Sequence, residues 1–165
     1  MRSYTASWED PRQVAEAGRT MPGLELMRGM IAGRFPPPPI AKLMNFRLAE
    51  VDNGLAIFEC EPGEMHYNPI GVVHGGLAMT LLDSCMGCAV HTSLQAGVGY
   101  TTLEAKVNLV RAITATTGKM RAVGKVIHAG RSVATAEGQL VDAAGKLYAH
   151  GTTTCMIFNG SSSGR

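Results

Sequence analysis

The chain has 165 residues, a formal net charge of +2, 45% hydrophobic residues and 17% charged residues. This length suits one domain with a sizeable core, and the composition excludes an intrinsically disordered chain. The small net charge does not by itself imply a nucleic-acid partner, and no apolar run reaches the roughly 18 residues that cross a bilayer. Because the first residues also lack the apolar segment of a secretory signal, we expect a cytoplasmic protein.

Residues 9–33 predict an N-terminal helical region, which a Pro-Gly pair interrupts. Asp10 is a suitable capping residue, and Pro11 suits the first helical position. The four prolines at 36–39 predict a stiff extended connector rather than a helix or a central strand. We therefore expect residues 1–39 to form a helical extension with a proline connector.

Beyond the prolines, the chain alternates between strand signals and turn signals. Asn53-Gly54 separates two strand candidates and is a strong hairpin signal. After Gly97, apolar residues recur at every second position, as in a half-buried strand. Strands are predicted at residues 42–51, 54–61, 103–109, 118–129, 132–142 and 146–157. Strands that succeed one another through short turns predict an antiparallel sheet.

One long helix is predicted from Gly76 to about Leu94. Its residues are apolar or small nearly all round, so most of its surface should be buried. One buried helix and about six strands predict an α+β fold in which the sheet curls around the helix. We expect this domain to span residues 40–158 and to be followed by a flexible Ser-rich tail at 159–165.

Cys85 and Cys88 form a C-x-x-C pair within the predicted helix. This spacing occurs in redox pairs and in half of a zinc site, but also where two small apolar residues share a buried helix face. No second C-x-x-C and no close pair of histidines completes a metal site in the sequence. We therefore favour the buried helix face and predict no metal.

Six basic residues and no acid lie between positions 106 and 131. Lys119, Arg121 and Lys125 share one parity, which places them on one face of a regular strand. The simpler interpretation is a solvated outer face, and the alternative is a site for a polyanionic small molecule. Nucleic acid is disfavoured because aromatic residues make up 5% of the chain and do not alternate with the basic ones.

The glycine turn before the helix is the strongest candidate for chemistry. The first amides of a helix lack intrahelical partners, so the N–H of Gly75 or Gly76 can point at a carbonyl oxygen that gains negative charge. Asp83, the only acid between Glu64 and Glu104, lies beyond this turn by about two helical turns, or ~10 Å. The two groups are too far apart to serve one carbonyl, so a catalytic arrangement predicts a site shared between subunits. The alternative is an ordinary helix aspartate that reaches solvent.

Two more polar residues flank the glycine turn. His74 can act as a general acid or base, or it can donate a hydrogen bond that shapes the loop, which we favour. Asn68 can orient a water molecule or an acyl carbonyl, or it can simply form the turn before Pro69. The sequence leaves both alternatives for Asn68 open.

These residues fit the pattern N-x-x-G-x-x-H-G-G-x-x-x-x-L-x-D, which resembles that of the PaaI-type (phenylacetic-acid degradation) acyl-CoA thioesterases of the hotdog fold. The pattern is carried by Asn68, Gly71, His74, Gly75, Gly76, Leu82 and Asp83. Weaker similarity extends over roughly residues 40–157, and the N-terminal extension and the tail fall outside it. The resemblance implies a long helix wrapped by an antiparallel sheet, a dimer with one continuous sheet, and often a tetramer.

The resemblance also implies roles for individual residues. Asp83 would act as the nucleophile or the general base, and the Gly75 N–H would polarise the thioester carbonyl. Asn68 and His74 would position the carbonyl and the water, and Thr101 would help to hold that water. The residues expected to contact CoA are Gly76, Thr102, Arg111, Gly130 and Arg131.

We therefore predict an acyl-CoA thioesterase that converts acyl-CoA and water to a free acid and CoA, without a cofactor or a metal. It is expected to form a homodimer with shared active sites, assembled into a homotetramer, and to bind neither membrane nor nucleic acid. One alternative is a non-catalytic acyl-CoA-binding or sensing protein of the same fold. The other is a hotdog enoyl-CoA hydratase or dehydratase.

Overall fold

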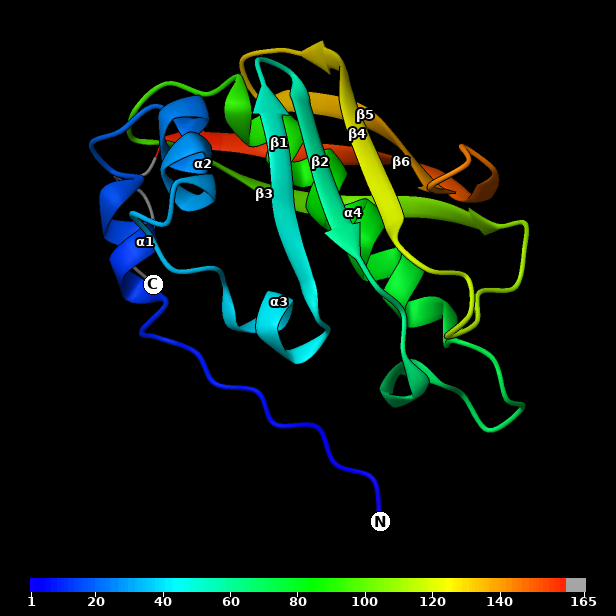
Figure 1. Cartoon of the computed structure of the whole chain (residues 1–165). Helices are drawn as coiled ribbons and strands as arrows, with labels where there is room; N and C mark the ends of the chain where they lie inside the picture. The colour runs from blue at the N-terminus through cyan, green and yellow to red at the C-terminus, as the bar shows by residue number, and fades with distance from the viewer. Residues whose placement is uncertain (160–165) are drawn as a thin grey trace.

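The computed structural model describes residues 1–159 and contains one curved sheet with a long helix against it (Figure 1). The remainder of the predicted tail, residues 160–165, lies outside the described residues. The helices are α1 (Arg12–Ala17), α2 (Gly23–Ile31), α3 (Pro39–Leu43), the short 3-10 helix η1 (Glu64–His66) and α4 (Gly75–Thr92). The strands are β1 (Phe46–Asp52), β2 (Leu55–Cys60), β3 (Val98–Leu109), β4 (Met120–Ala129), β5 (Val133–Asp142) and β6 (Leu147–Asn159).

The six strands form one sheet in the order β1-β2-β4-β5-β6-β3, and every neighbouring pair is antiparallel. This confirms the predicted α+β class and the predicted hairpin, in which Asp52 pairs with Leu55. Gly54 in that turn has a φ of +74°, a left-handed conformation that glycine adopts without steric cost. β1 and β3 are the edge strands, so one edge of β3 has no partner strand within the described chain.

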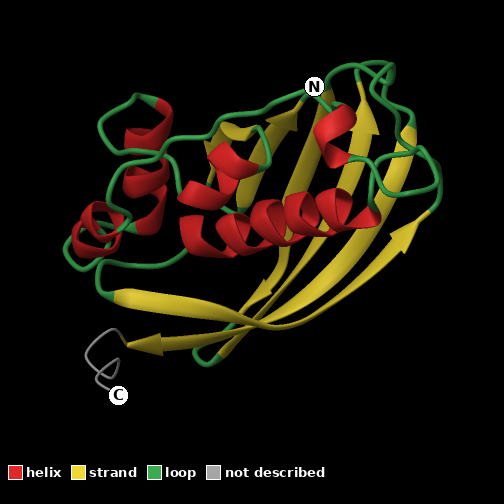
Figure 2. Cartoon of the chain, turned by 90° about the horizontal axis from the view of Figure 1, so that it is seen from below, coloured by secondary structure: helices red, strands yellow, loops and turns green. Residues whose placement is uncertain are grey.

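The helix α4 lies across the concave face of the sheet (Figure 2). The side chains of Leu81, Leu82 and Met86 are fully buried there, as the apolar surface of the predicted helix requires. Gly124 of β4 allows the two backbones to meet, because a Cβ at that position would lie 2.2 Å from the carbonyl oxygen of Cys85. The helix is therefore fixed against the sheet by direct backbone contact as well as by side chains.

The cysteine pair of α4 belongs to this packing. Cys85 is fully buried, and its thiol donates a hydrogen bond to the carbonyl oxygen of Leu82 at 3.3 Å. Burial raises the pKa of Cys85 and raises that of Cys88 to about 12, so both stay protonated near neutral pH. All four cysteines of the chain are free thiols. These features support the buried helix face rather than a redox pair.

The structure differs from the sequence-based expectation around the prolines. Pro39 is the first residue of α3, so the proline run does not end as an extended connector. A proline fits this position because the first turn of a helix needs no N–H from it. The strand expected from residue 42 consequently begins at Phe46. Pro11 is the N-cap of α1 rather than its first residue, and Asp10 accepts a hydrogen bond from the Arg12 N–H at 3.0 Å.

Candidate functional site

The loop between β2 and α4 is folded by its own polar groups. The Asn68 side-chain oxygen accepts hydrogen bonds from the N–H groups of Ile70 at 3.1 Å and Val72 at 3.3 Å. Gly71, within this turn, has a φ of +82°, which explains a glycine at this place in the pattern. Asn68 therefore does form the turn, and neither of these bonds uses its side-chain NH₂ group. Its predicted role in positioning a carbonyl or a water stays a prediction.

His74 is the N-cap of α4, and its Nδ1 accepts a hydrogen bond from the Gly76 N–H at 2.8 Å. Since Nδ1 accepts, the neutral ring carries its proton on Nε2. His74 thus shapes the start of the helix, as we favoured, although it does so by accepting a bond rather than by donating one. The cap occupies the Gly76 N–H, which leaves the Gly75 N–H as the uncapped one of the two candidate amides.

The Gly75 N–H is the amide that stays available at this helix end. Within the described residues it makes no hydrogen bond to any backbone or side-chain acceptor. Gly75 lies beside the end of β3, since a Cβ at this position would lie 2.5 Å from Cδ1 of Leu109. An unpaired amide at the positive end of an eighteen-residue helix is suited to bind an oxygen that carries negative charge.

Asp83 is exposed on α4, and its Oδ1 accepts a hydrogen bond from the Thr102 hydroxyl at 2.9 Å. The apolar helix therefore presents its one carboxylate at the surface of the described chain rather than in the core. Gly75 and Asp83 are eight helical positions apart, or ~12 Å along the axis, so a single chain does not bring them together. The shared site predicted from the sequence remains the arrangement that could unite them.

Thr102, rather than Thr101, has the hydroxyl that contacts Asp83 within one chain. The two threonines are neighbours on β3, and adjacent strand residues point to opposite faces of a sheet. Thr101 is exposed on the other face, and a bulge lies between Thr102 and Glu104. The water-holding role implied for Thr101 stays a prediction, and the structure adds Thr102 as a residue that orients the carboxylate.

The residues expected to contact CoA lie at two ends of the molecule. Arg111 lies just beyond β3 at the end where Gly75 lies, donates to the carbonyl oxygen of Leu147 at 3.3 Å and lies 5.6 Å from the ring centroid of Tyr148. Gly130-Arg131 instead lines a cavity of about 530 Å³ together with Ser93 and its neighbours, just past the C-terminal end of α4. The predicted CoA contacts of one chain therefore do not form a single binding site.

Two basic residues at the start of β4, Lys119 and Arg121, pair with acids that the sequence analysis did not connect with them. Arg121 forms an ion pair with Glu50 of β1, and Lys119 lies 3.6 Å from Glu59 of β2. The register pairs β2 directly with β4, which places these side chains on one face. This arrangement supports the solvated outer face rather than a site for a polyanion. The sequence indicated on which face of its own strand each side chain lies. It did not specify which strands pair, so these ion pairs could not be predicted.

His66 is a structural residue of the loop that the sequence reasoning missed. It is 9% exposed, its Nδ1 accepts from the Gly63 N–H at 3.0 Å, and its Nε2 lies 3.1 Å from the carbonyl oxygen of Met44. Its own carbonyl oxygen accepts from the His74 N–H at 2.7 Å. Burial lowers the pKa of His66. His66 therefore connects the capping histidine to the turn before β1, a contact that sequence spacing does not indicate.

Two further observations concern the described part of the chain. No group of three or more histidine, cysteine or acidic side chains is arranged there to hold a metal ion. None of its helices has the length and hydropathy that crossing a membrane requires.

Comparison with known proteins gives one family. Residues 70–149 match the thioesterase superfamily. The chain is 31% identical over 108 residues to a candidate esterase from Saccharolobus solfataricus. The match covers 66% of this chain and 75% of that relative. It is 29% identical to a candidate thioesterase from Ralstonia eutropha, a phenylacetic acid degradation-related protein, with a TM-score of 0.71 over 79% of this chain and 98% of that one.

A further similar structure was solved with a ligand. It is a hypothetical thioesterase protein from Streptococcus pneumoniae with coenzyme A, 21% identical to this chain. The TM-score is 0.63, and the match covers 70% of this chain and 87% of that one. At this identity the likeness shows a common fold.

Proposed function

Because this chain belongs to the thioesterase superfamily and has the predicted hotdog fold, we propose that it hydrolyses an acyl-CoA thioester to a free acid and CoA. The matched residues 70–149 contain both Gly75 and Asp83. The coarser assignment, a thioesterase-type hydrolase, comes from the family. The coenzyme A bound to the Streptococcus pneumoniae protein supports CoA as the thiol part of the substrate.

The observation that carries the proposal is the free Gly75 N–H together with an exposed, oriented carboxylate on the same helix. The thioester oxygen accepts from the Gly75 N–H, which stabilises the negative charge that develops during attack. With Asp83 as general base, the carboxylate takes a proton from water while the water oxygen bonds to the acyl carbon. The C–S bond then breaks, and the CoA sulfur leaves and is protonated.

Asp83 can also attack directly as the nucleophile. Its oxygen then bonds to the acyl carbon, CoA leaves, and water cleaves the resulting anhydride to regenerate the carboxylate. Both routes need the carboxylate close to the carbonyl bound at Gly75, and both use the Thr102 hydroxyl to orient it. They differ in whether the oxygen of water or that of Asp83 forms the first bond.

We propose that a second copy of the chain supplies the missing half of each site. Within one chain the two groups are ~12 Å apart along α4, which is too far for one reaction centre. The open edge of the twelve-residue β3 offers hydrogen-bonding groups to another strand, and an unpaired edge of this length favours such pairing. Two such dimers would make the predicted tetramer, and a cytoplasmic location stays our expectation.

The decisive experiment is Asp83→Asn in a thiol-release assay over aryl-, short-, medium- and long-chain acyl-CoAs. We expect turnover to fall at least about 10³-fold, because either route loses its reactive carboxylate. Glu104→Gln is the matched control, since it removes an exposed carboxylate that bonds Thr154 and leaves Asp83 in place. Wild-type rates in a folded Asp83→Asn protein would refute the mechanism.

The same assay separates the two alternatives. A binding or sensing protein would bind CoA thioesters without releasing thiol from any member of the panel. A hydratase would instead change the enoyl absorbance of an enoyl-CoA without producing free thiol. The proposed function predicts thiol release that matches acid formation one to one, so either other outcome rejects it.

A further inference from the structure

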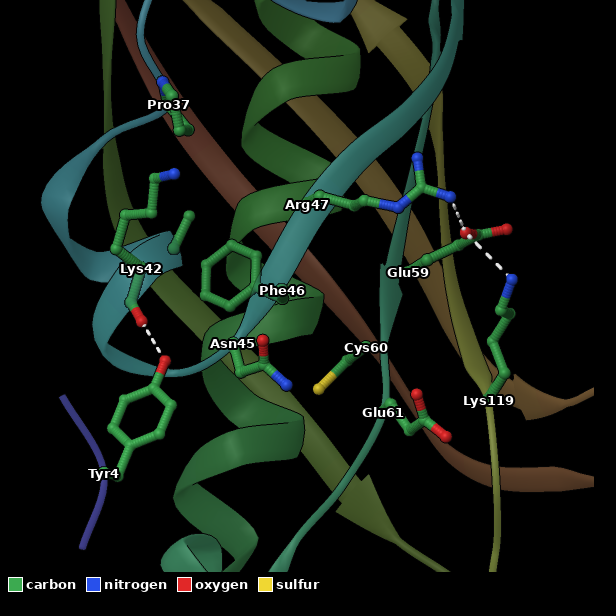
Figure 3. A pocket seen from close by; sticks show the side chains of 11 residues that line it. Tyr4, Pro37, Lys42, Asn45, Phe46, Arg47, Glu59, Cys60, Glu61 and Lys119 are labelled. Carbon is green, nitrogen blue, oxygen red and sulfur yellow. Dashed lines mark hydrogen bonds and ion pairs between the residues drawn. The ribbon is translucent and has the colours of Figure 1, made fainter. Parts of the chain in front are cut away.

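A cavity of about 360 Å³ lies between the N-terminal segment, α3 and the β1–β2 hairpin (Figure 3). This volume falls within the range of small-molecule sites in proteins. None of the residues expected to take part in thioester chemistry or CoA binding lines it. Apart from Lys119, every lining residue precedes residue 70, where the family match begins. The cavity is therefore built mainly by a part of the chain that the family match does not include.

The floor of this cavity is apolar. Phe46 of β1 and Cys60 of β2 lie there and are 6% and 3% exposed, and Ala41 of α3 is 3% exposed. Burial raises the pKa of the Cys60 thiol to about 12, so it contributes no charge near neutral pH. Pro37 and the ring of Tyr4 form one side, as Figure 3 shows. These surfaces suit an aliphatic or aryl group rather than a polar one.

The rim of the cavity carries charges of both signs. Lys42, Arg47 and Lys119 line it together with Glu59 and Glu61. Glu59 is only 16% exposed, pairs with Arg47 and lies 3.6 Å from Lys119, so two cations share this one carboxylate (Figure 3). Three cations against two carboxylates leave one positive charge. That balance matches a ligand with a single negative charge.

The N-terminal segment closes one side of the cavity through specific contacts. The Tyr4 hydroxyl donates to the carbonyl oxygen of Lys42, and Arg2 forms an ion pair with Glu64 at 2.8 Å. These contacts connect the segment to α3 and η1, although it has no regular secondary structure. Tyr4 is thereby held as a wall of the cavity.

We propose that this cavity is a second ligand site, which binds an organic monocarboxylate with a short apolar body. The apolar part lies over Phe46 and Cys60 beside Pro37 and the Tyr4 ring, and the carboxylate lies at the outer rim, where Arg47 and Lys119 present the N–H donors that Glu59 does not take. Each of these cations keeps N–H donors beyond those directed at Glu59. A nucleotide with several phosphate charges fits less well, because it would face Glu59 and Glu61. The assignment stands apart from the proposed thioester hydrolysis.

The test is calorimetric titration of the full-length protein with sodium octanoate. We expect Lys119→Glu to weaken octanoate binding at least about tenfold, because a favourable charge becomes a repulsive one. Lys125→Glu is the matched control, since it reverses an exposed lysine on β4 that does not line the cavity, and it should keep wild-type affinity. No octanoate binding to the wild type, or equal weakening in the two variants, overturns the proposal.

Four further arms fix the location and the chemistry. Tyr4→Ala should also weaken octanoate binding, and this side chain is 45% exposed, so its loss leaves the core intact. Octan-1-ol, which lacks the charge, should bind at least about tenfold more weakly than octanoate. Binding lost in Asp83→Asn but kept in Lys119→Glu would place octanoate at the thioester site and overturn the proposal. Adenosine 3′,5′-bisphosphate that binds in place of octanoate, with the same loss in Lys119→Glu, would overturn it as well.

Discussion

The two ends of α4 differ in how completely their backbone groups are paired. At the C-terminal end, the Thr92 hydroxyl donates to a helix carbonyl at 2.6 Å, and the Gly23 N–H of α2 donates to the carbonyl oxygen of Leu94 at 3.0 Å. At the N-terminal end, His74 caps one amide, and the Gly75 N–H has no acceptor within the described chain. The backbone groups at the C-terminal end are paired, whereas the N-terminal end has an unpaired donor, to which the proposed function assigns the thioester oxygen.

Among the substitutions that test this difference between the two ends, Gly75→Ala at the N-terminal end of α4 is expected to have the largest effect. Its methyl group would lie 2.5 Å from the end of the flexible Leu109 side chain and would crowd the approach to the free N–H. We expect kcat/KM for the best acyl-CoA substrate to fall about 10²-fold, the loss typical of one oxyanion-hole donor. The melting temperature should change little, because Leu109 can move and alanine favours the helix. An unchanged kcat/KM would show that Gly75 does not bind the carbonyl.

Gly23→Ala at the C-terminal end of α4 should give the opposite result. A Cβ there would lie 1.9 Å from the backbone oxygen of His91, and a backbone atom cannot move aside as a side-chain end can. We expect a loss of about 1–3 kcal/mol in the free energy of unfolding, measured in urea, with kcat per folded protein unchanged. Gly18→Ala is the control, because its nearest contact would be an ordinary 3.4 Å, and it should leave stability unaltered. If Gly23→Ala lowers kcat without lowering the free energy of unfolding, the C-terminal end of α4 does not have the purely structural role assigned to it.

The fold could be predicted from the sequence because its signals are local. The Asn53-Gly54 turn, the strand-like alternation before Leu109 and the apolar helix each indicate an element without knowledge of its neighbours. The extended connector predicted for the proline run is wrong at its end, because Pro39 fits the first turn of a helix as well as it fits a connector. The residues after Pro39 decide between the two, and Pro39–Leu43 is too short a helix to show a periodic pattern.

The site was less accessible from the sequence than the fold. The spacing between Gly75 and Asp83 already indicated that one chain cannot complete a site, and the helix geometry agrees with that arithmetic. Which hydroxyl reaches Asp83 could not be predicted, because two adjacent threonines point to opposite faces and the strand phase was unknown. The pairing of Arg121 with Glu50 also depends on strand order, which local patterns do not contain.

A smaller effect is expected from Thr102→Val, which tests the hydroxyl that donates a hydrogen bond to Asp83. Valine keeps the shape but removes the 2.9 Å hydrogen bond to Asp83, so the carboxylate loses its orientation. We expect kcat to fall about tenfold, in keeping with a hydrogen bond to a charged group, with the melting temperature nearly unchanged. Thr101→Val tests the water-holding role that the family resemblance implies for the neighbouring hydroxyl. A larger loss of kcat in Thr101→Val than in Thr102→Val would show that the reaction depends on Thr101 rather than on the hydroxyl that bonds Asp83.

The smallest effect is expected at His66, which connects His74, the N-cap of α4, to Met44. Burial lowers the pKa of His66 below its ordinary 6.5, so the unfolded chain binds more protons than the folded one between these two pKa values. The contribution of buried, neutral His66 to the free energy of unfolding is therefore complete above pH 6.5. It is lost as the pH falls from that value toward the lowered pKa.

The variant His66→Gln tests this, because glutamine can keep both side-chain hydrogen bonds and cannot be protonated. Urea unfolding between about pH 7.5 and about pH 5.5 should show a shallower loss of stability in this variant than in the wild type. Some pH dependence should persist, because burial also lowers the pKa of His91. An equally steep loss in both proteins would show that protonation of His66 does not limit the stability of the N-terminal end of α4.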